Sequence, residues 1–406
     1  MRARELAALV RVRPPMLGRV ERVLARSHDV DDLRREARRR LPRPVFDYVE
    51  GGADEELTLE DNRAAFRAWR FQPRALRDVS GVDTSCELFG SRQGIPIGLA
   101  PTGYTRMVHP EGELAVVRAA GARGVPYTLS TVATTSIEDV AAARGGEVWF
   151  QLYVLRDRGL TASLVDRAAG VGYSALEVSV DVAVSGHRAR DVRNGFTIPP
   201  RLTLRSVASI AARPGYWSGQ LRAPALAFAN IGDAEGAATI AGISALFDPA
   251  VGWDDLVAIR DRWPGTLVLK GPIAPEDAER AVGIGFDAIH LSNHGGRQLD
   301  RAPMPLDLLP AVRDRVGPAV AILVDSGIRH GADVAVALAR GADFCAVGRP
   351  YLYGLAASGE RGVLRAIDLL SEQLRRTMQL LGVASVAELR QEGARLVSPA
   401  GHPRSS

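Results

Sequence analysis

The sequence predicts an α/β protein built on a (β/α)8 TIM barrel, with an N-terminal helical segment and a long loop after strand 4. Short apolar runs ending in Gly, Pro, Ser or Asp alternate with amphipathic stretches over most of the chain, and we find eight such units. The runs are continuously apolar, which is typical of parallel strands buried on both faces. A barrel with insertions also accommodates 406 residues around one core.

The expected strands and helices follow each other in regular order. Strands are expected at residues 95–100, 127–129, 148–152, 175–180, 267–270, 288–291, 321–324 and 344–347. Helices are expected between them, for example at residues 112–123, 160–169, 275–284 and 331–340. This order gives each strand a polar carboxyl end at the same mouth of the barrel.

Three regions flank or interrupt the barrel. We expect residues 1–70 to form a helical segment packed on it, residues 71–390 to form the barrel, and residues 391–406 to form a tail that is disordered from about Ser398. Residues 196–253 are rich in Pro, Gly and aromatic side chains and too long for an ordinary barrel loop. This insertion is interpreted either as a functional lid or as a mobile excursion.

Composition limits the function classes. Cys86 and Cys345 are too few for a disulfide framework or a metal cluster, which fits a reducing cytoplasm and predicts no metal site. The sequence lacks an apolar run of the roughly 18 residues that a membrane span needs, and its start lacks the apolar core of a secretory signal. We therefore expect a cytoplasmic protein.

The first 43 residues are basic, with 13 Arg against six Asp and Glu. A basic leader can contact nucleic acid or an anionic membrane, whereas the more ordinary interpretation is a solvated helical arm on the barrel. Zinc spacing, an RNA-binding aromatic pattern and a helix-turn-helix are all missing from the sequence. We therefore predict no nucleic-acid function, and peripheral contact with the inner membrane stays open.

The chain contains a single lysine, Lys270, among 51 Lys and Arg residues. Lysine carries a compact point charge on a flexible stem, whereas the guanidinium of arginine is a wide planar fork. We expect Lys270 to lie where the fork does not fit. Chance survival of one lysine is the alternative.

Polar residues gather at the predicted strand ends, which indicates an active site. They include Pro101, Thr102, Ser130, Gln151, Tyr153, Ser179, Asp181, Lys270, Ser292, His294, Asp325, Gly327, Gly348 and Arg349. The last two strand ends each carry Gly and Arg, with Arg329 and Arg349 as forked donors. Loops after strands seven and eight are the usual phosphate site of barrels, so we predict a phosphate there.

The segment 292–300, Ser-Asn-His-Gly-Gly-Arg-Gln-Leu-Asp, is the main catalytic candidate. His294 is a candidate base because imidazole titrates near neutral pH. Arg297 could bind a substrate carboxylate in a bidentate manner, and the two glycines permit a tight turn. A surface turn with solvated side chains is the alternative. The other six histidines are expected to be structural or solvated: His28, His109, His187, His290, His330 and His402.

Four further side chains could complete this site. Asp181, just past the fourth strand, could orient His294 and stabilise its charge. Arg188 offers a second cation, although a loop salt bridge would explain it equally well. Tyr48 and Tyr153 are phenols that could bind a carboxylate or a developing oxyanion, whereas isolated tyrosines usually serve packing.

At these residues the chain resembles the FMN-dependent 2-hydroxy-acid dehydrogenase and oxidase family, which includes glycolate oxidase, lactate oxidase and mandelate dehydrogenase. The likeness runs from about Asp32 to Leu389 and looks most like the bacterial L-lactate dehydrogenase branch. It rests on Phe46-Asp47-Tyr48, Gly51-Gly52-Ala53, Ala100-Pro101-Thr102, His109-Pro110-Glu111-Gly112-Glu113, Gln151-Leu152-Tyr153, Val180-Asp181, Arg188, Arg193-Asn194-Gly195, Lys270-Gly271, and Ser292 through Asp300.

The resemblance implies FMN as cofactor and a role for each matching position. His294 would be the catalytic base with Asp181 as its partner, and Tyr153 would stabilise charge at the reacting oxygen. Lys270 would stand near flavin N1 and the C2 carbonyl, where a cation stabilises the reduced ring. The substrate carboxylate would be held by Tyr48, Arg188 and Arg297. FMN would be contacted by Pro101, Thr102, Ser130, Gln151, Ser179, Ser292, Asp325, Gly327, Arg329, Gly348 and Arg349.

Three positions depart from the glycolate-oxidising members. Val132 replaces a substrate-contacting tryptophan, Ser326 replaces a glycine, and Gly103 stands where several oxidases have alanine. Gly103 favours a dehydrogenase over an oxidase, with a quinone, a carrier protein or O2 as the open choices of acceptor. The wider pocket that Val132 implies permits a larger substrate.

The resemblance implies oxidation of an L-lactate-like 2-hydroxy acid to the 2-oxo acid by a homo-oligomer, with a tetramer as the family's form. A larger aryl 2-hydroxy acid or a modified peptide end is the alternative substrate. Whether His294 takes the hydroxyl proton or the carbon proton stays open. A non-catalytic barrel protein is the remaining alternative, and a purified protein that takes up no FMN would favour it.

Overall fold

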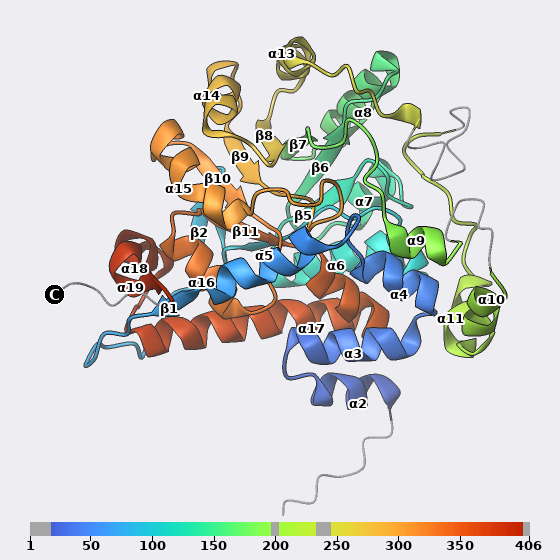
Figure 1. Ribbon diagram of the computed structural model, residues 1–406, viewed down its shortest axis with the longest axis horizontal. Coiled ribbons are helices and arrows are strands. Elements are labelled where there is room, and N and C mark those ends of the chain that lie inside the picture. Colours follow the sequence, from blue (N-terminus) through green and yellow to red (C-terminus); the bar gives the residue numbers. More distant parts are fainter. Residues whose placement is uncertain (1–17, 196–202, 233–244, 401–406) are drawn as a thin grey trace, which may run out of the picture.

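The computed structural model describes residues 18–195, 203–232 and 245–400. Eight parallel strands close into a barrel in the order β10-β11-β4-β5-β6-β7-β8-β9 (Figure 1). The strands are β4 (Ile97–Leu99), β5 (Tyr127–Ser130), β6 (Val148–Tyr153), β7 (Ala175–Ser179), β8 (Thr266–Gly271), β9 (Ala288–Leu291), β10 (Ala321–Val324) and β11 (Phe344–Val347). The predicted barrel and its eight strands are confirmed.

Nearly every strand residue is buried, because helices cover the outer face while side chains fill the interior. A hairpin of β2 (Cys86–Leu88) and β3 (Ser91–Gln93) closes the end where the strands begin. There, Leu88 packs in one cluster with Trp149 and Phe344. The opposite, carboxyl end is therefore the end that is left for a ligand.

Helices follow the strands in sequence order, and the four predicted examples are confirmed. The barrel helices are α6 (Gly112–Arg123), α7 (Ile137–Ala143), α8 (Arg158–Gly170), α13 (Trp253–Arg262), α14 (Pro275–Gly283), α15 (Pro305–Val316), α16 (Gly331–Ala339) and α17 (Arg349–Leu381), and η1 (Thr105–Met107) is a short 3₁₀ turn. Their starts are encoded locally: Ser136 and Asp157 cap the first amides of α7 and α8. Helix α17 is kinked at Ser358 and Gly359.

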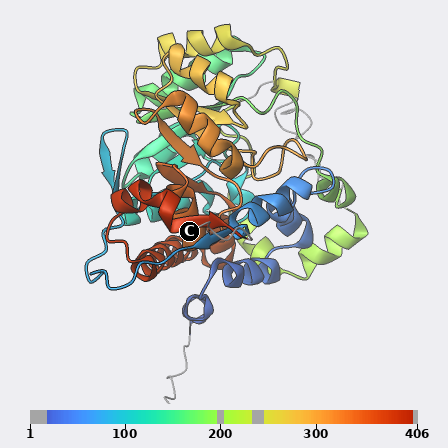
Figure 2. The ribbon, with the colours of Figure 1, turned by 60° about the vertical axis from the view of Figure 1, so that its left-hand side comes forward.

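The N-terminal segment is helical, as expected. It comprises α2 (Arg19–Arg26), α3 (Val30–Arg40), α4 (Arg43–Glu50) and α5 (Leu57–Arg67). Helix α3 buries Val30, Leu33 and Ala37, which share one face, and it packs along α17 (Figures 1 and 2). Residues 1–17 lie outside the described residues, and the division into segments at residues 70 and 390 stays a prediction.

The expectation of disorder from about Ser398 is wrong for the first residues concerned. After α18 (Val386–Gln391) and α19 (Gly393–Leu396), strand β12 (Val397–Pro399) pairs antiparallel with β1 (Trp69–Phe71). Ser398 is buried in this two-stranded sheet. The backbone hydrogen bonds with β1 supply the order that a polar, proline-containing sequence did not predict. Residues 401–406 lie outside the described residues.

The insertion after β7 contains helices of its own. These are α10 (Leu204–Ala211) and α11 (Pro214–Gln220), and α9 (Ala189–Arg193) precedes them. Figure 1 shows α9, α10 and α11 beside α4, at the edge of the barrel mouth. Parts of the predicted insertion, residues 196–202 and 233–244, lie outside the described residues.

Candidate active site

A cavity opens at the carboxyl ends of the strands and contains about 1340 Å³ of empty space, including its open mouth. Its lining comes from the ends of several strands, which is where ligands bind in barrels of this kind. The predicted site residues that line it are Tyr48, Pro101, Thr102, Ser130, Tyr153, Arg188, Lys270, His294, Arg297, Asp325, Gly327, Arg329, Gly348 and Arg349. Outside this lining are Gln151, Asp181, Ser179 and Ser292, which support it from the adjoining strand ends.

The turn after β9 orients the side chain of His294. His294, Gly295 and Gly296 all adopt positive φ angles of 59°, 64° and 75°. A Cβ atom on Gly296 would lie 2.7 Å from the amide nitrogen of Leu59, so the close approach of α5 requires glycine there. The Ser292 hydroxyl accepts a hydrogen bond from the backbone amide of His294 at 3.0 Å, which stabilises the turn.

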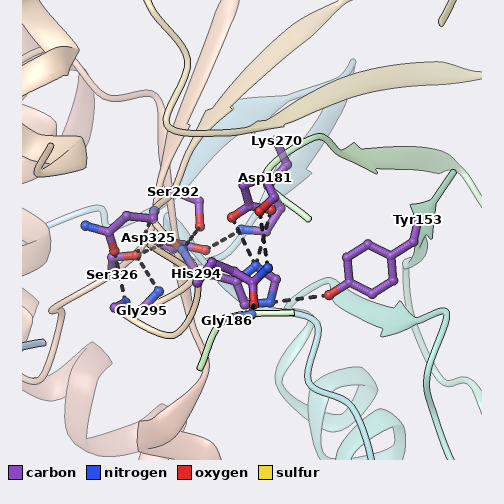
Figure 3. A network of polar contacts seen from close by, with 12 residues as sticks. Tyr153, Asp181, Gly186, Lys270, Ser292, His294, Gly295, Asp325 and Ser326 are labelled. Atoms are coloured by element: carbon purple, nitrogen blue, oxygen red, sulfur yellow. Dashed lines mark hydrogen bonds and ion pairs between the residues drawn. The ribbon is translucent and has the colours of Figure 1, made fainter. Parts of the chain in front are cut away.

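His294 lies between a carboxylate and a phenol (Figure 3). Its Nδ1 is 3.1 Å from Oδ2 of Asp181, and its Nε2 is 3.3 Å from the hydroxyl of Tyr153. The Asp181 side chain is only 5% exposed. This contact favours the tautomer with the proton on Nδ1, so Nε2 is an acceptor that can take a proton from a substrate or a hydrogen bond from the Tyr153 hydroxyl. Burial, assisted by Asp181, raises the pKa of Tyr153, so this phenol stays protonated.

Two guanidiniums line the same cavity as this histidine. Arg297 donates to the carbonyls of Tyr48 and Gly51 at 2.5 and 3.1 Å, and it lies over the Tyr48 ring. Arg188 donates to Asp191 at 2.8 Å. Among the described residues no carboxylate forms a salt bridge with Arg297, and burial together with Arg188 lowers its pKa. The site is therefore suited to an added anion.

A second cationic group surrounds the ends of β10 and β11. Arg349 is buried and donates to the carbonyls of Val49, Gly295 and Gly51 at 2.8–2.9 Å. Burial and the neighbouring Arg329 lower the pKa of Arg349 to about 9. Gly348 is the N-cap of α17, so the first amides of this helix point toward the same place. Two guanidiniums and a helix N-terminus form an anion site.

The single lysine lines the cavity from the end of β8 and is labelled in Figure 3. Lys270 is 3% exposed, and its Nζ is 2.6 Å from Oδ2 of Asp325. Burial alone would lower the pKa of Lys270, but the Asp325 carboxylate and its neighbours raise it. Lys270 therefore remains a cation beneath the cavity.

Comparison with known proteins identifies the family. The model of the family "FMN-dependent dehydrogenase" matches residues 37–396. This chain belongs to that family. A putative L-lactate dehydrogenase of Mycobacterium tuberculosis is 48% identical over 96% of this chain and 94% of its own length. The (S)-mandelate dehydrogenase of Pseudomonas putida is 38% identical over 92% and 96% of the two chains.

Solved structures agree with this membership. A crystal structure described as the monotopic membrane protein (S)-mandelate dehydrogenase superposes with a TM-score of 0.87, at 37% identity, and covers 92% of this chain and 100% of the other. The predicted family and the predicted cofactor, FMN, are confirmed. None of the helices in the described ranges is long and apolar enough to cross a membrane.

The residues of this FMN-dependent dehydrogenase fit the cofactor. Gln151 Nε2 on β6 and Ser179 Oγ on β7 are buried polar atoms without a hydrogen-bond partner in the described chain. Such orphan atoms are costly, and the polar edge of a flavin ring would satisfy them. The anion site at Arg329 and Arg349 matches the phosphate of the same molecule.

Some residues of the site were not predicted. Phe228 and Phe247, on either side of the undescribed part of the insertion, reach the cavity, and Val182 lines it as well. No sequence signal showed that this loop folds back on the mouth. His290 and Glu177 are buried inside the barrel. Of the two expectations for His290, structural or solvated, the solvated one is therefore wrong. The sequence signal for this pair was a titratable residue inside each of two otherwise apolar strand runs, residues 175–180 and 288–291.

Proposed function

We propose that this FMN-dependent dehydrogenase oxidises an L-2-hydroxy acid, such as L-lactate, to the 2-oxo acid, with His294 as the base. The observation that carries the proposal is that one imidazole and two guanidiniums, those of His294, Arg297 and Arg188, line one cavity together with the residues that fit FMN. An imidazole beside an anion site is the arrangement needed to deprotonate a hydroxy acid held by its carboxylate.

In this proposal Arg297, Arg188 and Tyr48 bind the substrate carboxylate. Fixing one end of the molecule orients the hydroxyl-bearing carbon and reduces the entropic part of the barrier. His294 Nε2 accepts a proton from the hydroxyl or from the carbon, and Asp181 stabilises the resulting imidazolium. Tyr153 donates its phenolic hydrogen toward the reacting oxygen.

FMN supplies the redox chemistry by accepting the two electrons. Its ring would lie against Pro101, Thr102 and Lys270. The polar edge would contact Ser130, Gln151, Ser179 and Ser292, and the ribityl chain and phosphate would contact Asp325, Gly327, Arg329, Gly348 and Arg349.

A variant pair tests the assignment of the base. His294→Gln keeps a neutral polar side chain, so we expect bound yellow FMN but nearly complete loss of flavin reduction by the substrate. His28→Gln is the matched control because His28 is exposed and remote from the cavity. Anaerobic mixing followed by flavin absorbance measures both. Reduction at nearly the wild-type rate in His294→Gln would remove His294 from the mechanism.

A larger or aryl 2-hydroxy acid, or a modified peptide end, is the second candidate substrate. Beside the catalytic group the cavity is lined by Val132, Val182, Phe228 and Phe247. Phe247 packs edge-on against Tyr153 at 5.1 Å between ring centres. Two phenyl rings and two valines are the surroundings that an aryl or long apolar substrate side chain favours. The ratio of kcat/KM for L-lactate, (S)-mandelate and longer hydroxy acids discriminates the two candidates.

We also propose peripheral contact with a membrane, which would bring the enzyme to a lipid-soluble acceptor such as a quinone. The support is a set of exposed apolar side chains on and next to α10 and α11: Leu204, Val207, Trp217 and Leu221. Leu204→Ser with Leu221→Ser is expected to reduce co-sedimentation with anionic vesicles. Unchanged co-sedimentation would contradict the contact. Carrier proteins and O2 remain alternative acceptors, to be compared by acceptor assays.

A further inference from the structure

A chain of buried charges continues from the cavity floor into the barrel. His290 on β9 contacts Oε1 of Glu177 on β7 through Nδ1, and its Nε2 lies 3.3 Å from Oδ2 of Asp325. The same carboxylate oxygen is 2.6 Å from Lys270 Nζ. Strand β8 separates β7 from β9 in the barrel wall, so Glu177 and His290 meet across the interior.

The charges along this chain alternate in sign when His290 is protonated, in the order Glu177, His290, Asp325 and Lys270. Glu177 and His290 are each 1% exposed, so water screens neither. A neutral His290 would leave Glu177 as a buried carboxylate without a cation, which is strongly unfavourable. Burial and Lys270 oppose a charge on His290, yet Glu177 and Asp325 outweigh them and raise its pKa. The cationic form therefore fits the surroundings best.

The arrangement gives Asp325 two cations that compete for one oxygen. If Lys270 were its only partner, the carboxylate would neutralise most of the ammonium field. His290 on the far side is attracted to the same oxygen, so the Asp325 carboxylate offsets less of the Lys270 charge. Part of that charge therefore remains uncompensated toward the cavity. Glu177 in turn holds His290 in place.

We propose that His290, held by Glu177, is a positioning residue that sets the electrostatic field of Lys270 at the flavin and thereby raises its reduction potential. The inference rests on the proposed placement of the flavin ring beside Lys270. It concerns the potential of bound FMN in the absence of substrate, so it can fail while the proposed substrate chemistry stands.

The test compares a double variant with one of its single components. Glu177→Gln with His290→Gln removes both charges and keeps hydrogen-bonding side chains. The two charges are opposite and His290 lies nearer to Asp325 and Lys270, so removing both leaves a partial loss of positive field. We expect the affinity ratio of reduced to oxidised FMN to fall by up to about tenfold, which lowers the two-electron potential by up to about 30 mV. His290→Gln alone removes the cation and leaves Glu177, so its potential should fall at least as far as that of the double variant.

Equilibration of the FMN-loaded protein with a reference dye measures the potential. A double variant with the wild-type potential would show that the pair serves packing only. A wild-type potential in His290→Gln alone would show that the charge of His290 is not the cause. If the glutamine pair does not fold, Glu177→Val with His290→Val tests the same decrease with side chains suited to a barrel core. His294→Gln should leave the potential unchanged, which separates this inference from the proposed function.

Discussion

Replacing Asp181 with asparagine isolates the charge behind the proposed base. Asparagine can still accept the Nδ1 hydrogen of His294, so the ring keeps its orientation while the negative charge is lost. The two charge centres lie roughly 4 Å apart, where an effective dielectric of 20 gives about 4 kcal/mol. Because His294 is 25% exposed, solvent reduces this value. The flavin reduction rate should therefore fall between about a hundredfold and a thousandfold.

Anaerobic stopped-flow mixing with saturating substrate measures this loss. Bound FMN should stay at the wild-type level, since Asp181 lies outside the cavity lining. Asp166→Asn is the matched control because Asp166 forms an exposed ion pair with Arg262 and should change nothing. Flavin reduction in Asp181→Asn within about threefold of the wild type would refute the role of this carboxylate as the partner of His294.

Four further predictions address other parts of the site. Arg297→Lys keeps the charge but loses the planar fork, so kcat/KM for the hydroxy acid should fall about a hundredfold in steady-state assays. Arg329→Gln should weaken FMN binding by about tenfold or more in fluorescence titrations and leave riboflavin binding unchanged, since only FMN carries the phosphate. Gly103→Ala places a Cβ atom 2.5 Å from Cγ2 of Val132. It should cost about 1–3 kcal/mol in thermal unfolding and be partly relieved by Val132→Ala. Although burial opposes ionisation, cations hold the pKa of Asp325 well below its usual value. The free energy of unfolding should therefore fall as the pH drops below about 4, and urea titrations should show a smaller decrease in Asp325→Asn.

The barrel could be predicted because each of its strands appears in the sequence as a local pattern. Runs such as residues 288–291 and 321–324 are short, apolar and bounded by turn residues, and neither needs a distant partner to be recognised. The spacing of His294 and Arg297 in one turn was equally local. Positions that depend on one segment alone were therefore predicted well.

Contacts between distant segments could not be predicted. Phe228 and Phe247 reach the cavity only because the insertion folds back across the mouth. Ser398 is ordered because β12 pairs with β1, more than 300 residues earlier in the sequence. His290 and Glu177 meet across the barrel, and their sequence separation of 113 residues carries no local signal.

The N-terminal segment is part of the site rather than a covering for the barrel. The carbonyls at the end of α4 hold both cationic groups: Gly51 accepts from Arg297 and from Arg349, while Tyr48 and Val49 accept from one each. The carboxyl end of a helix carries partial negative charge, which favours buried cations without neutralising them as a carboxylate would. The guanidiniums therefore keep their charge for the two anions of the proposed function, the substrate carboxylate and the phosphate. In that proposal one helix end orients the binding of both anions.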